Sequence, residues 1–209
     1  ILNIAKSMGI DFNSSYNYNA GIGLSQIIVT PQNIELSTYQ YNDTPYTGYL
    51  ALSTYLIQST PKKFYEYSIE IGEIGRYSFA QETQNGFHTV IGSQQAKGWD
   101  TQLKPQTVVN LFYQYGEISW EKQYKNKLQM DYSNSFGVNL GNYQTSTFIG
   151  STFRIGKNYI QNFNTHYPYL KEEANLVGMK GHKGFGYSVS VGAYGELLAY
   201  SYILDEAKN

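Results

Sequence analysis

Polar and apolar residues alternate along most of this chain with the period of a β-strand. From Leu128 to Leu140 the even positions are almost all apolar or aromatic, and the odd positions are polar or glycine. The same alternation runs through 16–25, 65–71 and 185–193. A period of two places successive side chains on opposite faces of a pleated strand. The pattern therefore predicts an all-β protein with an antiparallel up-and-down arrangement of strands.

The expected strands number about nine, and several exceed the 5 or 6 residues that are usual in globular proteins. They are 1–11, 16–29, 33–40, 46–58, 63–73, 106–122, 126–140, 142–157 and 184–202. Long strands favour a transmembrane β-barrel, in which about 9–11 tilted residues cross the bilayer. Tyrosines near segment ends agree, because aromatic residues gather at membrane interfaces. A soluble sandwich or lipocalin-like barrel, with its apolar face inward, remains the alternative.

An antiparallel order divides the connections between two ends. One end would hold the connections 11–16, 41–46, 74–105 and 140–142, and the other would hold 30–33, 59–62, 122–127 and 158–183. Asp11 and His88 would then share an end, with His166 and His182 opposite. A bacterial barrel needs an even number of strands. The odd count therefore predicts a single barrel domain over 1–209 that lacks its C-terminal strands.

One long loop, at 77–103, interrupts the alternation and holds a short predicted helix. Gln81, Gln84 and His88 fall on one stripe at spacings of three and four residues, and Gly92 is a natural helix stop. Loops on a rigid scaffold often carry function. The histidine on this helix therefore predicts a site in the loop.

Composition narrows the classes of function. The net charge is −1 with 15% charged residues, which leaves no electrostatic basis for binding nucleic acid. Cysteine is absent, so disulfides and thiolate chemistry are excluded. The chain contains no run of about 18 apolar residues, so the sequence predicts no membrane-spanning helix. The mean hydropathy of −0.43 is nevertheless compatible with a membrane barrel, since only every second residue of such a strand faces lipid.

Four motifs, in the same order, resemble those of the lipid A 3'-O-deacylases of Gram-negative outer membranes. They read YNAG at 18–21, NDTPYTGY at 42–49, QNGFHTVIG at 84–92 and GWDTQL at 98–103. The resemblance implies a twelve-stranded barrel in the outer membrane, with a short helix in one long outer loop. It also implies lipid A or lipopolysaccharide and outer-membrane lipids as partners, and we infer no obligate protein partner.

In that family the active site lies at the outer rim, between the barrel wall and the loop helix. The resemblance makes His88 the catalytic base that activates water, with Gln84 and Asn85 as supporting or substrate-binding residues. A calcium ion, with Asp11 among its ligands, would polarise the ester carbonyl and hold the oxyanion. A neutral imidazole can deprotonate water, and a hard divalent cation stabilises charge developing on oxygen. The implied reaction is hydrolysis of the ester-linked 3' acyl-oxyacyl chain.

The chain departs from the family pattern at positions that bear on calcium. Asp11 is the single candidate for the carboxylate of the family's first-strand Asn-Asp pair, Asn19 replaces a threonine, and Gln94 stands where some members carry an acidic residue. The amides of Asn19 and Gln94 can supply carbonyl oxygens, with less charge than the carboxylates that calcium prefers. The alternative function is therefore a catalytically decayed or non-enzymatic outer-membrane barrel, either a channel or a scaffold.

Overall fold

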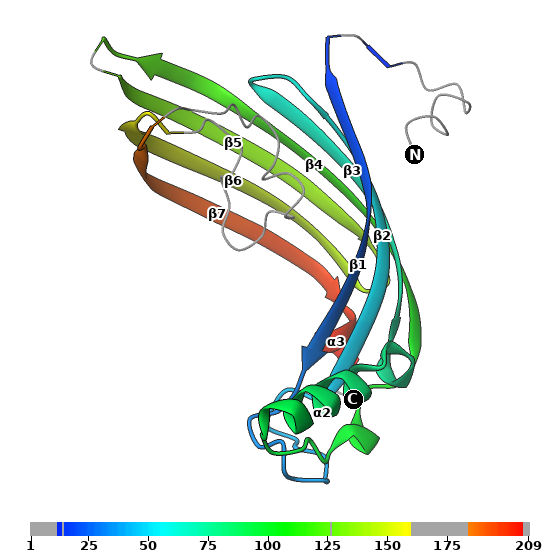
Figure 1. Cartoon of the computed structure of the whole chain (residues 1–209). Coiled ribbons are helices and arrows are strands. Elements are labelled where there is room, and N and C mark those ends of the chain that lie inside the picture. Colours follow the sequence, from blue (N-terminus) through cyan, green and yellow to red (C-terminus); the bar gives the residue numbers. More distant parts are fainter. Residues whose placement is uncertain (1–11, 14, 126, 160–183, 207–209) are drawn as a thin grey trace.

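Seven antiparallel strands form one sheet in the part of the chain that the computed structural model describes, which is residues 12–13, 15–125, 127–159 and 184–206. Each strand pairs with the next one along the chain. The strands are β1 (Asn17–Val29), β2 (Thr47–Ser59), β3 (Lys63–Ile74), β4 (Gln106–Gln123), β5 (Leu128–Gly141), β6 (Gln144–Lys157) and β7 (Tyr187–Ser201). The helices are η1 (Gly75–Ser78), α2 (Ala80–Ile91), η2 (Trp99–Thr101) and α3 (Tyr202–Glu206). Figure 1 shows the sheet as a curved wall with α2 and α3 at the same end.

Seven of the nine predicted strands are confirmed, with ends that shift by at most three residues. The strand predicted at 33–40 is wrong, because this segment belongs to the loop between β1 and β2. Its backbone is held by side chains. The Asn33 carbonyl accepts from Gln40 Nε2 at 2.8 Å, and the Ile34 carbonyl accepts from the Tyr46 hydroxyl at 2.9 Å. Such local bonds compete with strand pairing. The strand predicted at 1–11 lies outside the described residues.

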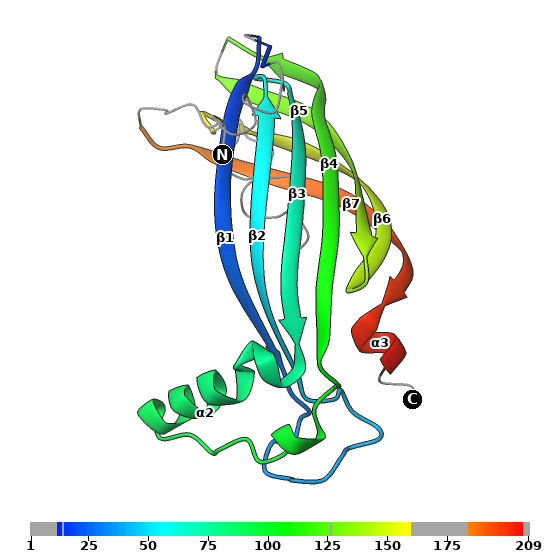
Figure 2. The same cartoon turned by 90° about the vertical axis from the view of Figure 1, so that its right-hand side faces the viewer.

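The connections divide between the two ends of the sheet. Those that follow β1, β3 and β5 meet at the end that carries α2, and those that follow β2 and β4 meet at the other end (Figures 1 and 2). The prediction that 41–46, 74–105 and 140–142 share an end is thus confirmed. The placement of 30–33 and 11–16 is wrong. Without a strand at 33–40, β1 runs in the direction opposite to the one expected, so the described residues just before it (12, 13, 15 and 16) lie at the end far from α2.

The two faces of the sheet differ sharply in polarity. Apolar side chains line up across strands on what we call the outer face, where Leu24 pairs with Leu52 and Ile71 pairs with both Leu52 and Val109, and all four are exposed. The opposite, inner face holds polar side chains that are buried, including Glu66, Gln114, Asp131 and Arg154. A wall that is apolar outside and polar inside is typical of transmembrane strands.

The alternative of a soluble β-sandwich is wrong, because every described strand belongs to one sheet and none forms a second layer. The apolar residues of 128–140 also do not fill an interior, since Phe136 and Leu140 are exposed on the outer face. No helix in the described part of the chain is long and apolar enough to cross a membrane.

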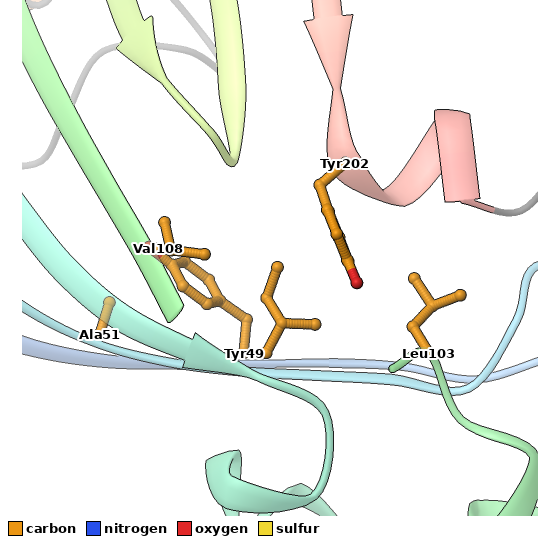
Figure 3. Close-up of a cluster of buried hydrophobic side chains, with 6 residues drawn as sticks. Tyr49, Ala51, Leu103, Val108 and Tyr202 are labelled. Carbon is orange, nitrogen blue, oxygen red and sulfur yellow. The ribbon is translucent and has the colours of Figure 1, made fainter. Parts of the chain in front are cut away.

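Helix α3 closes over the inner face at the α2 end. Tyr202 packs there with Tyr49, Leu103 and Val108 in one buried cluster, as Figure 3 shows. The Tyr202 hydroxyl donates to the Lys104 carbonyl at 3.1 Å. The segment after β7 is therefore tied to β2 and β4, which fixes the shape of the sheet at this end.

Candidate active site

The long loop between β3 and β4 packs on the outer face of β1 and β2. At Gly48 a Cβ would come within 2.0 Å of Ser78 Oγ and 2.4 Å of Ala80 Cβ, so the missing side chain allows the loop to touch β2. From β1, Gln26 Nε2 donates to the Ser78 carbonyl at 2.6 Å. The start of α2 is therefore fixed against the outside of the wall.

A small core lies beneath α2. Tyr46, Ala80, Ala96 and Trp99 are buried together, and the rings of Tyr46 and Trp99 meet edge to face at 5.0 Å. Burial raises the pKa of the Tyr46 hydroxyl, so it stays a neutral hydrogen-bond donor to the Ile34 carbonyl. Trp99 thus pins the returning loop to the wall, with its ring in the small core and its N–H hydrogen-bonded.

Helix α2 ends where the sequence predicts. Gly92 adopts a left-handed conformation with φ of 69°, which terminates the helix, and the Ser93 N–H donates to the His88 carbonyl at 2.8 Å. At the other end, Phe79 also has a left-handed φ of 56°, an uncommon conformation for a large side chain. The sharp turn at Gly92 sends residues 93–99 back along one side of the helix.

Two side chains of α2 hold this returning segment. Asn85 Nδ2 donates to the Ala96 carbonyl at 3.2 Å, and the Ala96 N–H donates to Asn85 Oδ1 at 2.9 Å. One residue earlier, Gln84 Oε1 accepts from Trp99 Nε1 at 3.0 Å. Gln84 and Asn85 therefore fix the loop around the site, and their side chains hydrogen-bond Trp99 and Ala96 and not the His88 ring.

His88 lies half-buried between α2 and the returning segment. Its Nδ1 forms a short hydrogen bond with the backbone carbonyl of Gln94. Because a carbonyl can only accept, the Nδ1 atom must carry a proton, and in the neutral tautomer of the ring the lone pair is on Nε2. Nε2 has no hydrogen bond to any residue that the structure describes. The arrangement suits a base that takes a proton at Nε2 while its other nitrogen is held in place.

The structure does not bring every predicted site residue to His88. Asn19 lies on β1 opposite Ile57, ten residues from Val29 at the α2 end. At about 3.3 Å per strand residue this separation is roughly 33 Å. Asp11, His166 and His182 lie outside the described residues. Gln94 does reach His88, although it contributes its backbone carbonyl and not the side-chain oxygen that the sequence suggested for a metal.

The described residues do not, by themselves, fit a calcium site. No three His, Asp or Glu side chains converge in the described part of the chain. At the α2 end, Asp43 accepts hydrogen bonds from the N–H groups of Gln32 and Thr44, both at 2.7 Å, and these bonds lower its pKa. Calcium prefers six to eight oxygen ligands, several of them carboxylates. Calcium therefore stays a prediction.

A second polar constellation, which the sequence did not single out, lies at the far end of the sheet. Asp131 on β5 and Arg154 on β6 are paired in register and form a buried ion pair with an Nη2–Oδ2 distance of 3.0 Å. The Tyr159 hydroxyl donates to the same oxygen of Asp131 at 2.6 Å. The sequence did hold a signal for this ion pair, because opposite charges occupy polar-face positions of neighbouring strands. Recognising that the two residues face each other, however, requires the register of β5 against β6.

The carbonyl of Gln94 was also missed as a partner of His88. A backbone acceptor carries no residue-type signal, so nothing in the sequence could have identified it. The nearest available hint was the helix stop at Gly92, which forces the chain to double back past the imidazole.

Two comparisons with known proteins give matches that cover nearly the whole chain. The family model described as outer membrane protein LpxR matches residues 3–209. The solved structure of LpxR from Salmonella typhimurium superposes with a TM-score of 0.76 at 18% sequence identity, a likeness that shows the fold alone. The match covers 94% of this chain and 66% of that one, so the chain spans just under two thirds of the solved structure. No curated protein matches the sequence.

Proposed function

Because the chain belongs to the LpxR family of outer membrane proteins, we propose that it is an outer-membrane hydrolase that removes an ester-linked acyl chain from lipid A. The bond cleaved is the ester of the 3' acyl-oxyacyl chain, which is what the four motifs at 18–103 imply. The single observation that carries the chemistry is the geometry of His88, whose Nδ1 is held by a carbonyl while Nε2 is open.

The proposed reaction uses water as the nucleophile. His88 Nε2 takes a proton from water, and the resulting hydroxide attacks the ester carbonyl carbon. The tetrahedral intermediate collapses with cleavage of the bond to the sugar oxygen, which receives the proton from Nε2. The acyl chain leaves as a carboxylic acid. The Gln94 carbonyl accepts from Nδ1–H throughout, which orients the ring and stabilises its charged form.

A closed barrel is part of the same proposal. The outer edges of β1 and β7 have no strand beside them in the described part of the chain. Backbone N–H and C=O groups left unpaired in lipid cost several kcal/mol each, so an open edge is not tolerated there. Further strands must therefore complete the wall, in line with the twelve that the resemblance implies.

The calcium requirement is tested separately from the base. Deacylation by the purified protein is measured in detergent after removal of divalent cations with EGTA and again after calcium is restored. Loss and recovery of activity would support a calcium site that includes residues outside the described ranges. Full activity in EGTA would contradict it and leave the base untouched.

The test of the proposed function is the substitution His88→Ala. We expect loss of about 10²–10⁴-fold in the rate of acyl release, which is the usual contribution of a general base. Lipid A from cells expressing the wild type, the variant or no protein is compared by mass spectrometry. The control is Glu82→Gln, on an exposed position of the same helix, which should retain activity.

The outcomes separate the two candidate functions. Retained activity in His88→Ala, with the protein folded in detergent, would remove His88 as the base. Unchanged lipid A in cells that express the folded wild type would instead favour the non-enzymatic barrel, either a channel or a scaffold.

A further inference from the structure

Helix α2 carries large apolar side chains that the described part of the protein leaves uncovered. Phe87 is 61% exposed, Val90 84% and Ile91 57%. They are separated by three and four residues along the helix, so they share one side of it. Three apolar side chains on one side of a short helix are too many to leave in water without a reason.

The opposite side of the helix is fully engaged. Asn85 and His88 reach the returning segment, and the Thr89 hydroxyl accepts from Gln95 Nε2 at 3.1 Å. The loop therefore holds α2 in one rotation about its axis. That rotation turns the apolar side away from the protein, and His88, three residues before Ile91, lies at its border.

The apolar side of α2 is continuous with the outer face of the sheet. The segment that leads into α2 packs on the outer side of β1 and β2, through Gly48 and Gln26. Further along the same face of β1, Leu24 is 74% exposed. Figure 2 shows α2 lying across the end of the strands and extending sideways past β1. A helix in this position meets the surface of the bilayer that the wall crosses.

We propose that α2 is an interfacial helix whose side chains Phe87, Val90 and Ile91 insert among the acyl chains of the membrane beside the wall. Helices with one apolar side lie at a bilayer surface with that side buried about 5–10 Å below the headgroups. The insertion itself does not require catalysis. It extends the proposed function in one respect, because it places His88 at the level where the ester bonds of a membrane lipid lie.

The chain has no cysteine, so single-cysteine variants can be labelled with a nitroxide at chosen positions. The test position is Val90→Cys, the matched control on the same helix is Glu82→Cys, and the lipid-facing reference is Leu24→Cys. Each labelled full-length protein is reconstituted in dioleoylphosphatidylcholine vesicles. Power-saturation EPR then compares collisions with oxygen, which enters lipid, and with a nickel chelate, which stays in water.

We expect the oxygen-to-nickel accessibility ratio at Val90→Cys to exceed that at Glu82→Cys several-fold and to approach that at Leu24→Cys. Equal ratios at the two helix positions would overturn the proposal, because α2 would then lie in water. Low accessibility to both reagents at Val90→Cys would also overturn it, because protein would cover the helix. Spin–spin broadening would identify that protein as a second copy of this chain.

The result is independent of turnover, so it can be told apart from a failure of the proposed function. A lipid signal at Val90→Cys in a protein that does not change lipid A would retain the interfacial helix and remove the deacylase. A water signal at both Val90→Cys and Leu24→Cys would show that the wall itself is not in lipid, which contradicts the proposal as well.

Discussion

The α2 end of the sheet holds a half-buried imidazole with one nitrogen open, whereas the far end holds a buried ion pair whose carboxylate oxygen also accepts two hydrogen bonds. At the far end, Asp131 Oδ2 accepts hydrogen bonds from Arg154 Nε and from the Tyr159 hydroxyl, and it lies 3.0 Å from Arg154 Nη2 in the ion pair. Burial, together with the bond to Asp131, raises the pKa of Tyr159, so it remains a donor. At the α2 end, the acceptor of His88 is a neutral carbonyl. Polar groups that are all paired with one another, as at the far end, contribute to structure. A side chain with one hydrogen-bonding atom left without a partner, as at the α2 end, can take part in a reaction.

The largest effect on stability is expected at the far end. Arg154→Met leaves Asp131 buried without its counter-ion, which costs about 3–5 kcal/mol of unfolding free energy. The measurement is denaturant unfolding in detergent micelles, and activity per folded molecule should not change. The double variant Asp131→Leu with Arg154→Met should recover most of the loss, because no buried charge remains. A double variant as unstable as the single one would contradict this account of the pair.

The next effect concerns how α2 is attached to the wall. Gly48→Ala forces a Cβ into Ser78 Oγ and Ala80 Cβ, and Ala80 can move only with the helix. Overpacking of this kind costs about 1–3 kcal/mol. We expect a lower melting temperature in detergent and reduced deacylation, because His88 moves with α2.

The matched control is Gly86→Ala on α2, where an added Cβ meets no atom within 4 Å. Alanine favours a helix over glycine by about 1 kcal/mol, so this variant should keep its activity and become slightly more stable. Equal losses in Gly48→Ala and Gly86→Ala would show that α2 is insensitive to its contact with β2.

The strands were predictable because their information is local. The alternation of 128–140 identifies a strand and its two faces without reference to any other segment. Helix α2 was also predictable, from the spacing of its polar residues and from Gly92. The segment 33–40 was not, because its backbone is held by long side chains and by the Lys97 N–H, which donates to the Ile34 carbonyl at 2.9 Å.

The site was predictable only in its residue types. The motif at 84–92 indicated His88, Gln84 and Asn85, but not that the two amides bind Trp99 and Ala96 instead of the imidazole. Asn19 stands near the start of the predicted strand 16–29, so the predicted strand at 33–40 would have put it at the same end as His88. Removing that strand reverses β1, and the register then separates them by the length of the wall.

A smaller effect is expected at Asn85, which we predict to be a positioning residue for His88. Its amide holds Ala96, two residues after the carbonyl that binds Nδ1. Asn85→Ala removes both hydrogen bonds, at about 1 kcal/mol each. We expect kcat to fall roughly tenfold with KM little changed, since a tenfold change corresponds to about 1.4 kcal/mol.

Nitrogen-15 NMR of histidine-labelled protein distinguishes positioning from general destabilisation. The signal of His88, assigned by its absence in His88→Gln, should show the Nδ1–H tautomer in the wild type and a mixture of tautomers in Asn85→Ala. An unchanged tautomer in a variant with lowered kcat would contradict the positioning role.

The smallest effect is expected at Asp43, a carboxylate at the α2 end that is exposed where Asp131 is buried. The N–H groups of Gln32 and Thr44 lower its pKa below the ordinary value of 3.8. A lowered pKa in the folded state gives stability that is present above the unfolded pKa and is lost as pH falls through the folded one. The melting temperature of the wild type should therefore exceed that of Asp43→Asn slightly at pH 7, and the difference should shrink below about pH 4.

A difference in melting temperature that does not depend on pH would mean that Asp43 stabilises the loop through its shape and not through its charge. The contrast with Arg154→Met follows from burial, because water screens the charge of Asp43 and cannot reach that of Asp131.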